Sequence, residues 1–253
     1  MSTAPDYVAG HGLLTGKRVL VTAAAGTGIG FQAAQRCVEE GATVVVSDKH
    51  ERRTAEAAEK LGVVGIPCDV TVESDVRSLV DGAVAAMGGV DVFINNAGLG
   101  GEVPIVDMTD EQWDLVLDVT LTSTFRCLRA ELQYLYANGG GVIVNNASVL
   151  GWRAQAGQAH YAAAKAGVMA LTRCAAIEAA PHGVRINAVA PSLAMQAFLA
   201  KATTEETLAE LTQREAFGRA AEPWEVANVM VFLASDYSSY MTGEVVSVSS
   251  QRA

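Results

Sequence analysis

The sequence has few residues of the kinds that stabilise or anchor a protein outside the cytoplasm. Its four cysteines lie far apart, with no CxxC pair and no histidine at a metal-ligand spacing, which argues against a disulfide framework and a zinc site. No stretch reaches the ~18 uncharged apolar residues of a membrane span. The first 16 residues lack the basic start and apolar segment of a secretory signal. We therefore expect a cytoplasmic protein that binds no metal and no membrane.

Positive charge is also scarce. The chain has 18 Lys and Arg against 28 Asp and Glu, so its net charge at pH 7 is −10. An acidic chain whose basic residues form no stripe is poorly suited to a phosphate backbone, and we expect no nucleic-acid partner. Charged residues make up 18% of the sequence and hydrophobic residues 50%, which indicates a folded chain with a large core.

Strand and helix patterns alternate along the chain. Short β-rich apolar runs predict strands at Arg18–Thr22, Thr43–Asp48, Val63–Cys68, Val90–Asn95, Gly141–Asn146, Arg185–Ala190 and Glu244–Val248. Apolar positions three and four apart predict helices at Gly30–Glu40, Glu51–Leu61, Val76–Met87, Thr109–Ala137, Gln158–Ala179 and Trp224–Leu233. Runs such as Val44–Val46 lack alternation, as in parallel strands covered on both faces. The order predicts an α/β Rossmann fold, with residues 1–253 as one domain around a doubly wound, seven-stranded parallel sheet.

A glycine-rich turn follows the first predicted strand. Its residues include Ala24, Gly26, Thr27, Gly28, Ile29 and Gly30. Glycines let the backbone turn tightly and let a pyrophosphate approach the start of the next helix, where unpaired N–H groups favour an anion. A purely structural turn is the alternative, because the motif alone is weak evidence.

Asp48 ends the second predicted strand, 18 residues after Gly30. A carboxylate there can accept both hydroxyls of an adenosine ribose and repel a 2′-phosphate, so NAD is favoured over NADP. Two alternatives stay open. Asp48 could cap the next helix, and Lys49, Arg52 and Arg53 could form a phosphate-binding patch.

Three further motifs complete an ordered pattern. Asn95–Gly98 follows the fourth predicted strand, Ser148 follows the fifth, and Tyr161 and Lys165 lie four residues apart on a helix. In this combination the chain resembles the short-chain dehydrogenase/reductase family from Gly16 onward, which implies interconversion of a secondary alcohol and a ketone with NAD or NADP. The resemblance implies cofactor contacts at Asp69, Val70, Asn96, Ala97, Gly98, Tyr161, Lys165, Pro191 and Ser192.

Tyr161 has the chemistry that this reaction needs. When a hydride moves between cofactor and carbinol carbon, a proton must leave or reach the oxygen. Lys165 is the i+4 neighbour of Tyr161 on the helix, and its ammonium, with the charge of a nicotinamide, is expected to lower the pKa of the phenol. Lys165 can also donate to ribose hydroxyls, and Ser148 can hold the substrate oxygen. The alternative is an ordinary helix pair with a strand-end serine.

The chain departs from the family pattern at several positions. Ala24 stands where the first glycine is usual, and its methyl group is expected to narrow the phosphate approach. Thr120 replaces the Asn that fixes a proton-relay water. The usual Pro-Gly and later Thr are Pro191-Ser192 and Gln196, and the usual Asp-Gly-Gly at the end of the last strand is Ser249-Ser250-Gln251.

Three segments add a narrower resemblance. Gly10–Leu14, Gly151–Gln155 and Phe217–Trp224 resemble an actinobacterial subgroup linked to steroid ring degradation, which implies a ring hydroxyl on a CoA thioester of a bicyclic steroid remnant. We expect a substrate site built from Leu150, Trp152, Arg153, Gln155 and a lid at about 193–217, after a short N-terminal extension, 1–16. Trp152 offers an apolar wall and Arg153 a partner for an anion, although a surface arginine is the alternative.

Other readings remain open at this point. A 3-oxoacyl-thioester reductase of general lipid metabolism would use the same residues, and Thr120, Ser192 and Gln196 also fit a catalytically weak nucleotide-binding protein. The histidines are expected at the surface or as caps, with His160 nearest the site. The long helices Thr109–Ala137 and Gln158–Ala179 resemble those through which family members assemble, which implies a homotetramer or a homodimer.

Overall fold

A computed structural model describes residues 3–195 and 205–251, with the side chains of 205–207 outside that description. It contains a seven-stranded sheet in the order β3-β2-β1-β4-β5-β6-β7, and all its paired strands run parallel. The strands are β1 (Arg18–Val21), β2 (Thr43–Asp48), β3 (Val64–Pro67), β4 (Val92–Asn95), β5 (Gly141–Asn146), β6 (Val184–Pro191) and β7 (Val245–Val248). The predicted Rossmann fold is therefore confirmed, with strand boundaries that differ by at most a few residues.

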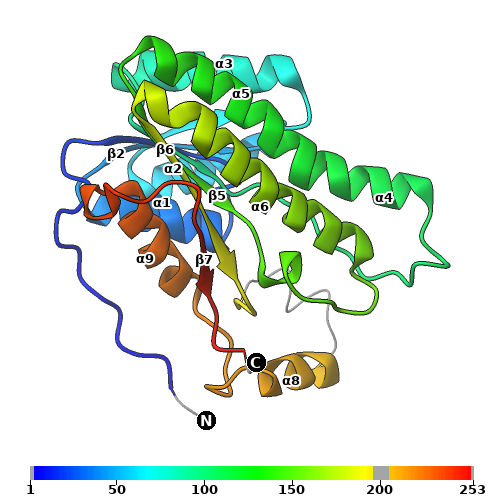
Figure 1. Cartoon of the computed structure of the whole chain (residues 1–253). Coiled ribbons are helices and arrows are strands. Elements are labelled where there is room, and N and C mark those ends of the chain that lie inside the picture. The colour runs from blue at the N-terminus through cyan, green and yellow to red at the C-terminus, as the bar shows by residue number, and fades with distance from the viewer. Residues whose placement is uncertain (1–2, 196–204, 252–253) are drawn as a thin grey trace.

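Helices cover both faces of the sheet (Figure 1). One face carries α1 (Ile29–Glu39), α2 (Glu51–Leu61) and α9 (Pro223–Ala234), and the other carries α3 (Glu73–Met87), α5 (Ser123–Ala137) and α6 (Ala159–Ala179). A shorter helix, α8 (Glu205–Gln213), lies beside the C-terminus, beyond the carboxyl ends of the strands (Figure 1). The site residues predicted from the strand ends thus share one edge of the sheet.

The core explains why the strands are apolar without alternation. Val44 and Val46 pack in the cluster under α1 and α9, whereas Val45 packs in the cluster under α3, α5 and α6. Because both faces are covered, the four central positions of the strand, Val44 to Ser47, are all buried.

The predicted helix Thr109–Ala137 consists of three parts. α4 (Asp110–Leu117) begins with a capping box between Thr109 and Gln112, as the sequence indicates. A π-helical turn over Asp118–Thr122 then leads into α5 without a break. Thr120 lies in this π-helical turn and is fully buried.

The N-terminal segment packs on α1 through a buried ion pair. Glu40, only 1% exposed, accepts the backbone N–H groups of His11 (2.8 Å) and Leu13 (3.0 Å) and pairs with Arg36 at 2.9 Å. Arg36 also donates to the carbonyl of Val8 at 2.7 Å. These bonds tie a stretch without regular secondary structure to the first helix.

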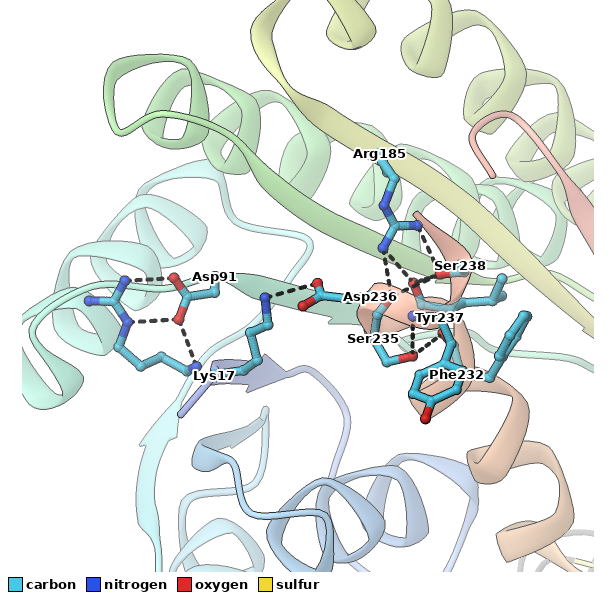
Figure 2. A network of polar contacts seen from close by, with 10 residues as sticks. Lys17, Asp91, Arg185, Phe232, Ser235, Asp236, Tyr237 and Ser238 are labelled. Atoms are coloured by element: carbon cyan, nitrogen blue, oxygen red, sulfur yellow. Dashed lines mark hydrogen bonds and ion pairs between the residues drawn. The ribbon is translucent and has the colours of Figure 1, made fainter. Parts of the chain in front are cut away.

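A second polar network closes the amino end of the sheet, opposite the predicted site (Figure 2). Arg185, at the start of β6, donates to the carbonyl oxygens of Leu233 (3.2 Å) and Ser235 (3.0 Å) and to the hydroxyl of Ser238 (3.0 Å). A cation is favourable at the carboxyl end of α9 because the last carbonyls of a helix lack intrahelical partners. Within the described ranges, no helix is long and apolar enough to cross a membrane.

Candidate active site

Ser148, Tyr161 and Lys165 meet at the carboxyl end of β5. Ser148 follows the strand, and its hydroxyl accepts the N–H of Leu150 at 3.2 Å and is hydrogen-bonded to the phenol of Tyr161. Tyr161 and Lys165 lie on the first turns of α6. Lys165 is buried, and its Nζ donates to the carbonyl of Asn146 at 2.6 Å. The structure thus brings together the three residues predicted to carry the chemistry.

Burial dominates the electrostatics of Tyr161. It raises the pKa of Tyr161 above its usual value, and the hydrogen bond from Ser148 only partly offsets this. The Lys165 ammonium donates to Asn146 and lies 5.6 Å from the centroid of the Tyr161 ring. The lowering expected from this ammonium together with the charge of a nicotinamide stays a prediction. Burial lowers the pKa of Lys165 to about 8. At neutral pH the phenol is therefore protonated and the lysine is still charged.

His160 lies inside the protein, so the prediction of a surface position is wrong. Its Nδ1 accepts the N–H of Tyr161 at 2.9 Å within the first turn of α6, and burial lowers its pKa. Nδ1 is therefore the unprotonated nitrogen. Among the described residues, no group of three His, Cys, Asp or Glu side chains is placed to hold a metal ion.

Thr120 lies behind Gly98 and is fully buried. Its hydroxyl accepts the N–H of Leu99 at 2.9 Å and donates to the carbonyl of the same residue at 3.1 Å. In this arrangement the side chain fixes the backbone after the Asn-Asn-Ala-Gly motif.

The glycine-rich turn fits a bound pyrophosphate. α1 begins at Ile29 with Gly28 as its N-cap residue, and no described side chain caps it, so the first N–H groups of the helix are open to an anion. A Cβ at Gly30 would lie 2.2 Å from the carbonyl oxygen of Ala23 and 2.4 Å from Nδ2 of Asn96, so only glycine allows this close packing. Ala24 is buried in the core cluster below the turn, so the prediction that its methyl group narrows the phosphate approach is wrong.

The region around the end of β2 is rich in paired charges. Asp48 ends β2, and one of its oxygens accepts the N–H of His50 at 3.1 Å. Lys49 pairs with Asp69 at 2.6 Å, and this bond, with two from Thr71, lowers the pKa of Asp69 to about 2 despite the opposing effect of burial. Arg52 pairs with Glu56 at 3.3 Å, and Arg53 lies 3.8 Å from Asp48.

The predicted substrate residues lie on the segment that follows Ser148. Leu150 is half-buried, Trp152 is 51% exposed, and Gln155 is half-buried. Arg153 is exposed and donates to Oε1 of Gln251 in the C-terminal segment. The structure describes the predicted lid at 193–195 and 205–217, whereas Gln196, Phe198 and Leu199 lie outside the described residues.

A buried polar layer beneath the site was missed by the sequence reasoning. Nδ2 of Asn95 donates to Glu131 (2.9 Å) and to Asn145 (3.1 Å), and Asn145 donates to the hydroxyl of Thr172 (3.0 Å). The layer links α5, β4, β5 and α6. Burial raises the pKa of Glu131 to about 8, so its carboxyl is mostly protonated at neutral pH. Nothing in the sequence pointed to this role of Glu131, because a glutamate in a predicted helix is expected on its exposed face.

Glu131 should make stability depend on pH. Its folded pKa of about 8 lies above the usual value of 4.5, so its contribution to stability is fully present below pH 4.5 and is lost as pH rises through 8. Glu131→Gln removes this loss. Between pH 4.5 and pH 8, the free energy of unfolding of the variant should therefore rise relative to that of the wild type by up to about 1.4 kcal/mol for each pH unit. Urea unfolding at pH 5, 7 and 9 measures the difference. An exposed control, Glu59→Gln, should run parallel to the wild type, and a Glu131→Gln curve that also does so would contradict the assignment.

Comparison with known proteins agrees with this geometry. A family model described as "Enoyl-(Acyl carrier protein) reductase" (adh_short_C2) matches residues 23–250. A Mycobacterium tuberculosis protein named (5R,7aS)-5-hydroxy-7a-methyl-1-oxo-2,3,5,6,7,7a-hexahydro-1H-indene-carboxyl-CoA reductase is 63% identical over 258 residues, which cover 99% of this chain and 98% of that protein.

Two further similarities span most of the chain. The crystal structure of a short chain dehydrogenase from Mycobacterium smegmatis is 60% identical, covers 99% of both chains and has a TM-score of 0.89. The 3-oxoacyl-[acyl-carrier-protein] reductase FabG of Thermotoga maritima is 36% identical over 240 residues, 93% of this chain and 97% of that protein. Together with the Ser148, Tyr161 and Lys165 site, these matches show that the chain belongs to the short-chain dehydrogenase/reductase family of NAD(P)-dependent oxidoreductases.

Proposed function

We propose that this enzyme interconverts a ring ketone and a ring secondary alcohol on a CoA thioester of a bicyclic, steroid-derived acid, with NAD as cofactor. The observation that carries the proposal is the half-buried Tyr161 beside Ser148 and Lys165 in a chain that is 63% identical to a hydroxy-oxo-hydroindene-carboxyl-CoA reductase. The CoA thioester and the bicyclic ring come from the name of that relative.

Each catalytic side chain has one role in the proposed reaction. The nicotinamide supplies or accepts the hydride when the cofactor is bound. In the reduction direction, Tyr161 donates its phenolic proton to the carbonyl oxygen, and Ser148 donates a hydrogen bond to the same oxygen. Lys165 donates to ribose hydroxyls and places a positive charge near the phenolate that forms. The raised pKa of Tyr161 suits a proton donor.

NAD is the cofactor that the charges around β2 support. Asp48 ends that strand, while Lys49 and Arg52 each pair with a carboxylate and Arg53 lies near Asp48 itself. A 2′-phosphate would have to displace these partners and approach the Asp48 carboxylate. Ribose hydroxyls, in contrast, can donate to it.

Replacing Asp48 tests this preference. Asp48→Asn should raise the KM for NADH about tenfold, because a hydrogen bond to a charged acceptor is lost, and should lower the KM for NADPH, because a like charge is removed. Initial rates with both cofactors measure the shift. The exposed control Glu51→Gln should change neither KM, and a wild-type enzyme that prefers NADPH would contradict the role of Asp48.

A panel of ketones tests the substrate class. A bicyclic ring ketone should be reduced fastest as its CoA thioester, more slowly as the free acid, and a linear 3-oxoacyl-CoA should be a poor substrate. Preference for the linear thioester would favour the alternative function, a 3-oxoacyl-thioester reductase of lipid metabolism, which is the class of enzyme to which the relative FabG belongs. Failure of every ketone and alcohol, with NADH still bound, would favour a weak nucleotide-binding protein.

We also propose a homotetramer. Large apolar side chains are exposed on α4 and α5, at Trp113, Leu115 and Phe125, and at Ile177 on α6, which is the kind of surface that partners cover. A stable monomer at micromolar concentration in sedimentation would contradict this. The cytoplasmic location and the lid at 193–217 stay predictions.

A further inference from the structure

A buried carboxylate joins the loops that follow β6 and β7. Glu215, 1% exposed, lies two residues after α8 and accepts the hydroxyls of Ser192 (3.0 Å) and Ser250 (2.9 Å) and the N–H of Leu193 (3.3 Å). Within the described part of the chain, no lysine or arginine forms an ion pair with it. Three hydrogen bonds therefore offset the cost of burying this carboxylate.

The two serines stand at positions where the family resemblance implies glycine. Ser192 replaces the glycine after Pro191, and Ser250 replaces a glycine after the last strand. A glycine at either position would remove one of the donors to Glu215. Two departures from the family pattern therefore serve one carboxylate, which would otherwise be buried with a single backbone donor.

The same contact fixes the C-terminal segment against the substrate side of the site. The N–H of Ala216 donates to the carbonyl of Ser250, and Glu215 pairs with Gln251 in an antiparallel bridge. Figure 1 shows the C-terminus beside α8. Oε1 of Gln251 in turn accepts a hydrogen bond from Arg153, on the segment that follows Ser148.

The partner of Arg153 leaves its charge uncompensated. Gln251 is neutral, and within the described residues Arg153 forms no ion pair, whereas Arg18, Arg36 and Arg219 each pair with a carboxylate. The Arg153 side chain is exposed. Its backbone N–H donates to the carbonyl of Val149 at 3.0 Å, which holds the loop in place. A fixed, unpaired guanidinium suits a phosphate or carboxylate of a ligand.

We infer that Glu215 is a positioning residue: it holds the loops after β6 and β7 together and, through Gln251, sets Arg153 to bind the anionic part of an acyl-CoA substrate. This inference rests on the proposed function. It names the part of the protein that distinguishes a CoA thioester from a thioester with a smaller carrier. Glu215 itself touches no reacting atom in this role.

The test compares one ring-ketone acyl group on two carriers, coenzyme A and N-acetylcysteamine, which lacks the phosphates. Glu215→Gln and Arg153→Gln should each raise the KM for the CoA thioester about tenfold, since each weakens one charge-assisted contact. For both variants, kcat, the KM for NADH and all constants for the cysteamine thioester should stay within about twofold. The double variant should lose no more than either single one, because both act on one contact. Glu210→Gln, an exposed change on α8, is the matched control.

Equal losses with both thioesters, or additive losses in the double variant, would overturn the inference. If Glu215→Gln does not fold, Ser250→Ala removes one of the three bonds and should show the same selective rise in KM at smaller size.

A wild type that reduces no thioester would contradict the proposed function. The role of Glu215 therefore also needs a measurement that does not depend on turnover. Amide hydrogen exchange at Leu193 and Ala216 should then rise in Glu215→Gln and not in Glu210→Gln, and titration with coenzyme A alone should show weaker binding for Glu215→Gln and Arg153→Gln. Unchanged exchange or unchanged binding would overturn the inference.

Discussion

Replacing Tyr161 by phenylalanine should lower kcat for ketone reduction roughly 10²- to 10⁴-fold, the range that a positioned proton donor contributes. The phenol is hydrogen-bonded to Ser148, and burial keeps it protonated at neutral pH. Phenylalanine keeps the ring and its packing on α6 and removes only the hydroxyl. The substrate oxygen then has Ser148 as its remaining donor, and Ser148 has no comparable proton to give.

Binding measurements separate a chemical effect from a structural one. NADH affinity of Tyr161→Phe, followed by fluorescence, should stay within about threefold of the wild type, because the substitution removes only a hydroxyl group. Tyr237, 77% exposed and at the opposite end of the sheet, provides the matched control, and Tyr237→Phe should keep full activity. A Tyr161→Phe enzyme with more than a tenth of wild-type kcat would contradict the assignment of the proton donor.

Replacing Arg36 by alanine should lower the free energy of unfolding by about 3–5 kcal/mol, the usual cost of removing one partner of a buried ion pair. Glu40 would keep its bonds from His11 and Leu13 but lose the only cation that pairs with it among the described residues. The carbonyl of Val8 would lose its donor as well. Urea unfolding followed by circular dichroism measures the change, and the N-terminal segment should become sensitive to proteolysis.

Two further variants identify the cause of that loss. Arg52→Ala removes an exposed i,i+4 pair with Glu56 and should cost less than about 0.5 kcal/mol. The double variant Arg36→Met, Glu40→Leu replaces both charges by apolar groups and should be more stable than Arg36→Ala, because no unpaired charge stays buried. Equal losses for Arg36→Ala and Arg52→Ala would contradict a buried pair.

The sequence predicted the parts of this protein that depend on neighbouring residues. Runs such as Val44–Val46 predicted a sheet covered on both faces because local composition reports burial directly. Tyr161 and Lys165 could be placed on one helix by their spacing. Short-range geometry is what a sequence encodes most openly.

Contacts between distant segments could not be predicted in the same way. Glu131 reaches Asn95 across 36 residues and Glu215 reaches Ser250 across 35, and each carboxylate occurs in a helix or turn whose pattern fits an exposed side chain. The position of the Ala24 methyl group and the effect of burial on the pKa of Tyr161 could not be predicted for a related reason. Both depend on what the folded chain packs around the residue, which spacing alone does not report.

The departures from the family pattern have different consequences. Thr120 uses its hydroxyl on the backbone of Leu99, so the difference there concerns the loop after β4. Ser192 and Ser250 share Glu215, so they are parts of one contact between the loops that follow β6 and β7.

The most direct test of the central claim follows the hydride itself. Purified enzyme would be given NADH carrying deuterium at both C4 positions and a bicyclic ring ketone as its CoA thioester, and the product analysed by mass spectrometry. The account predicts that the wild-type enzyme forms a product with one deuterium on the new carbinol carbon, and that Tyr161→Phe forms this product far more slowly. A reduced product without deuterium on that carbon, or no reduction of the ring ketone, would contradict it.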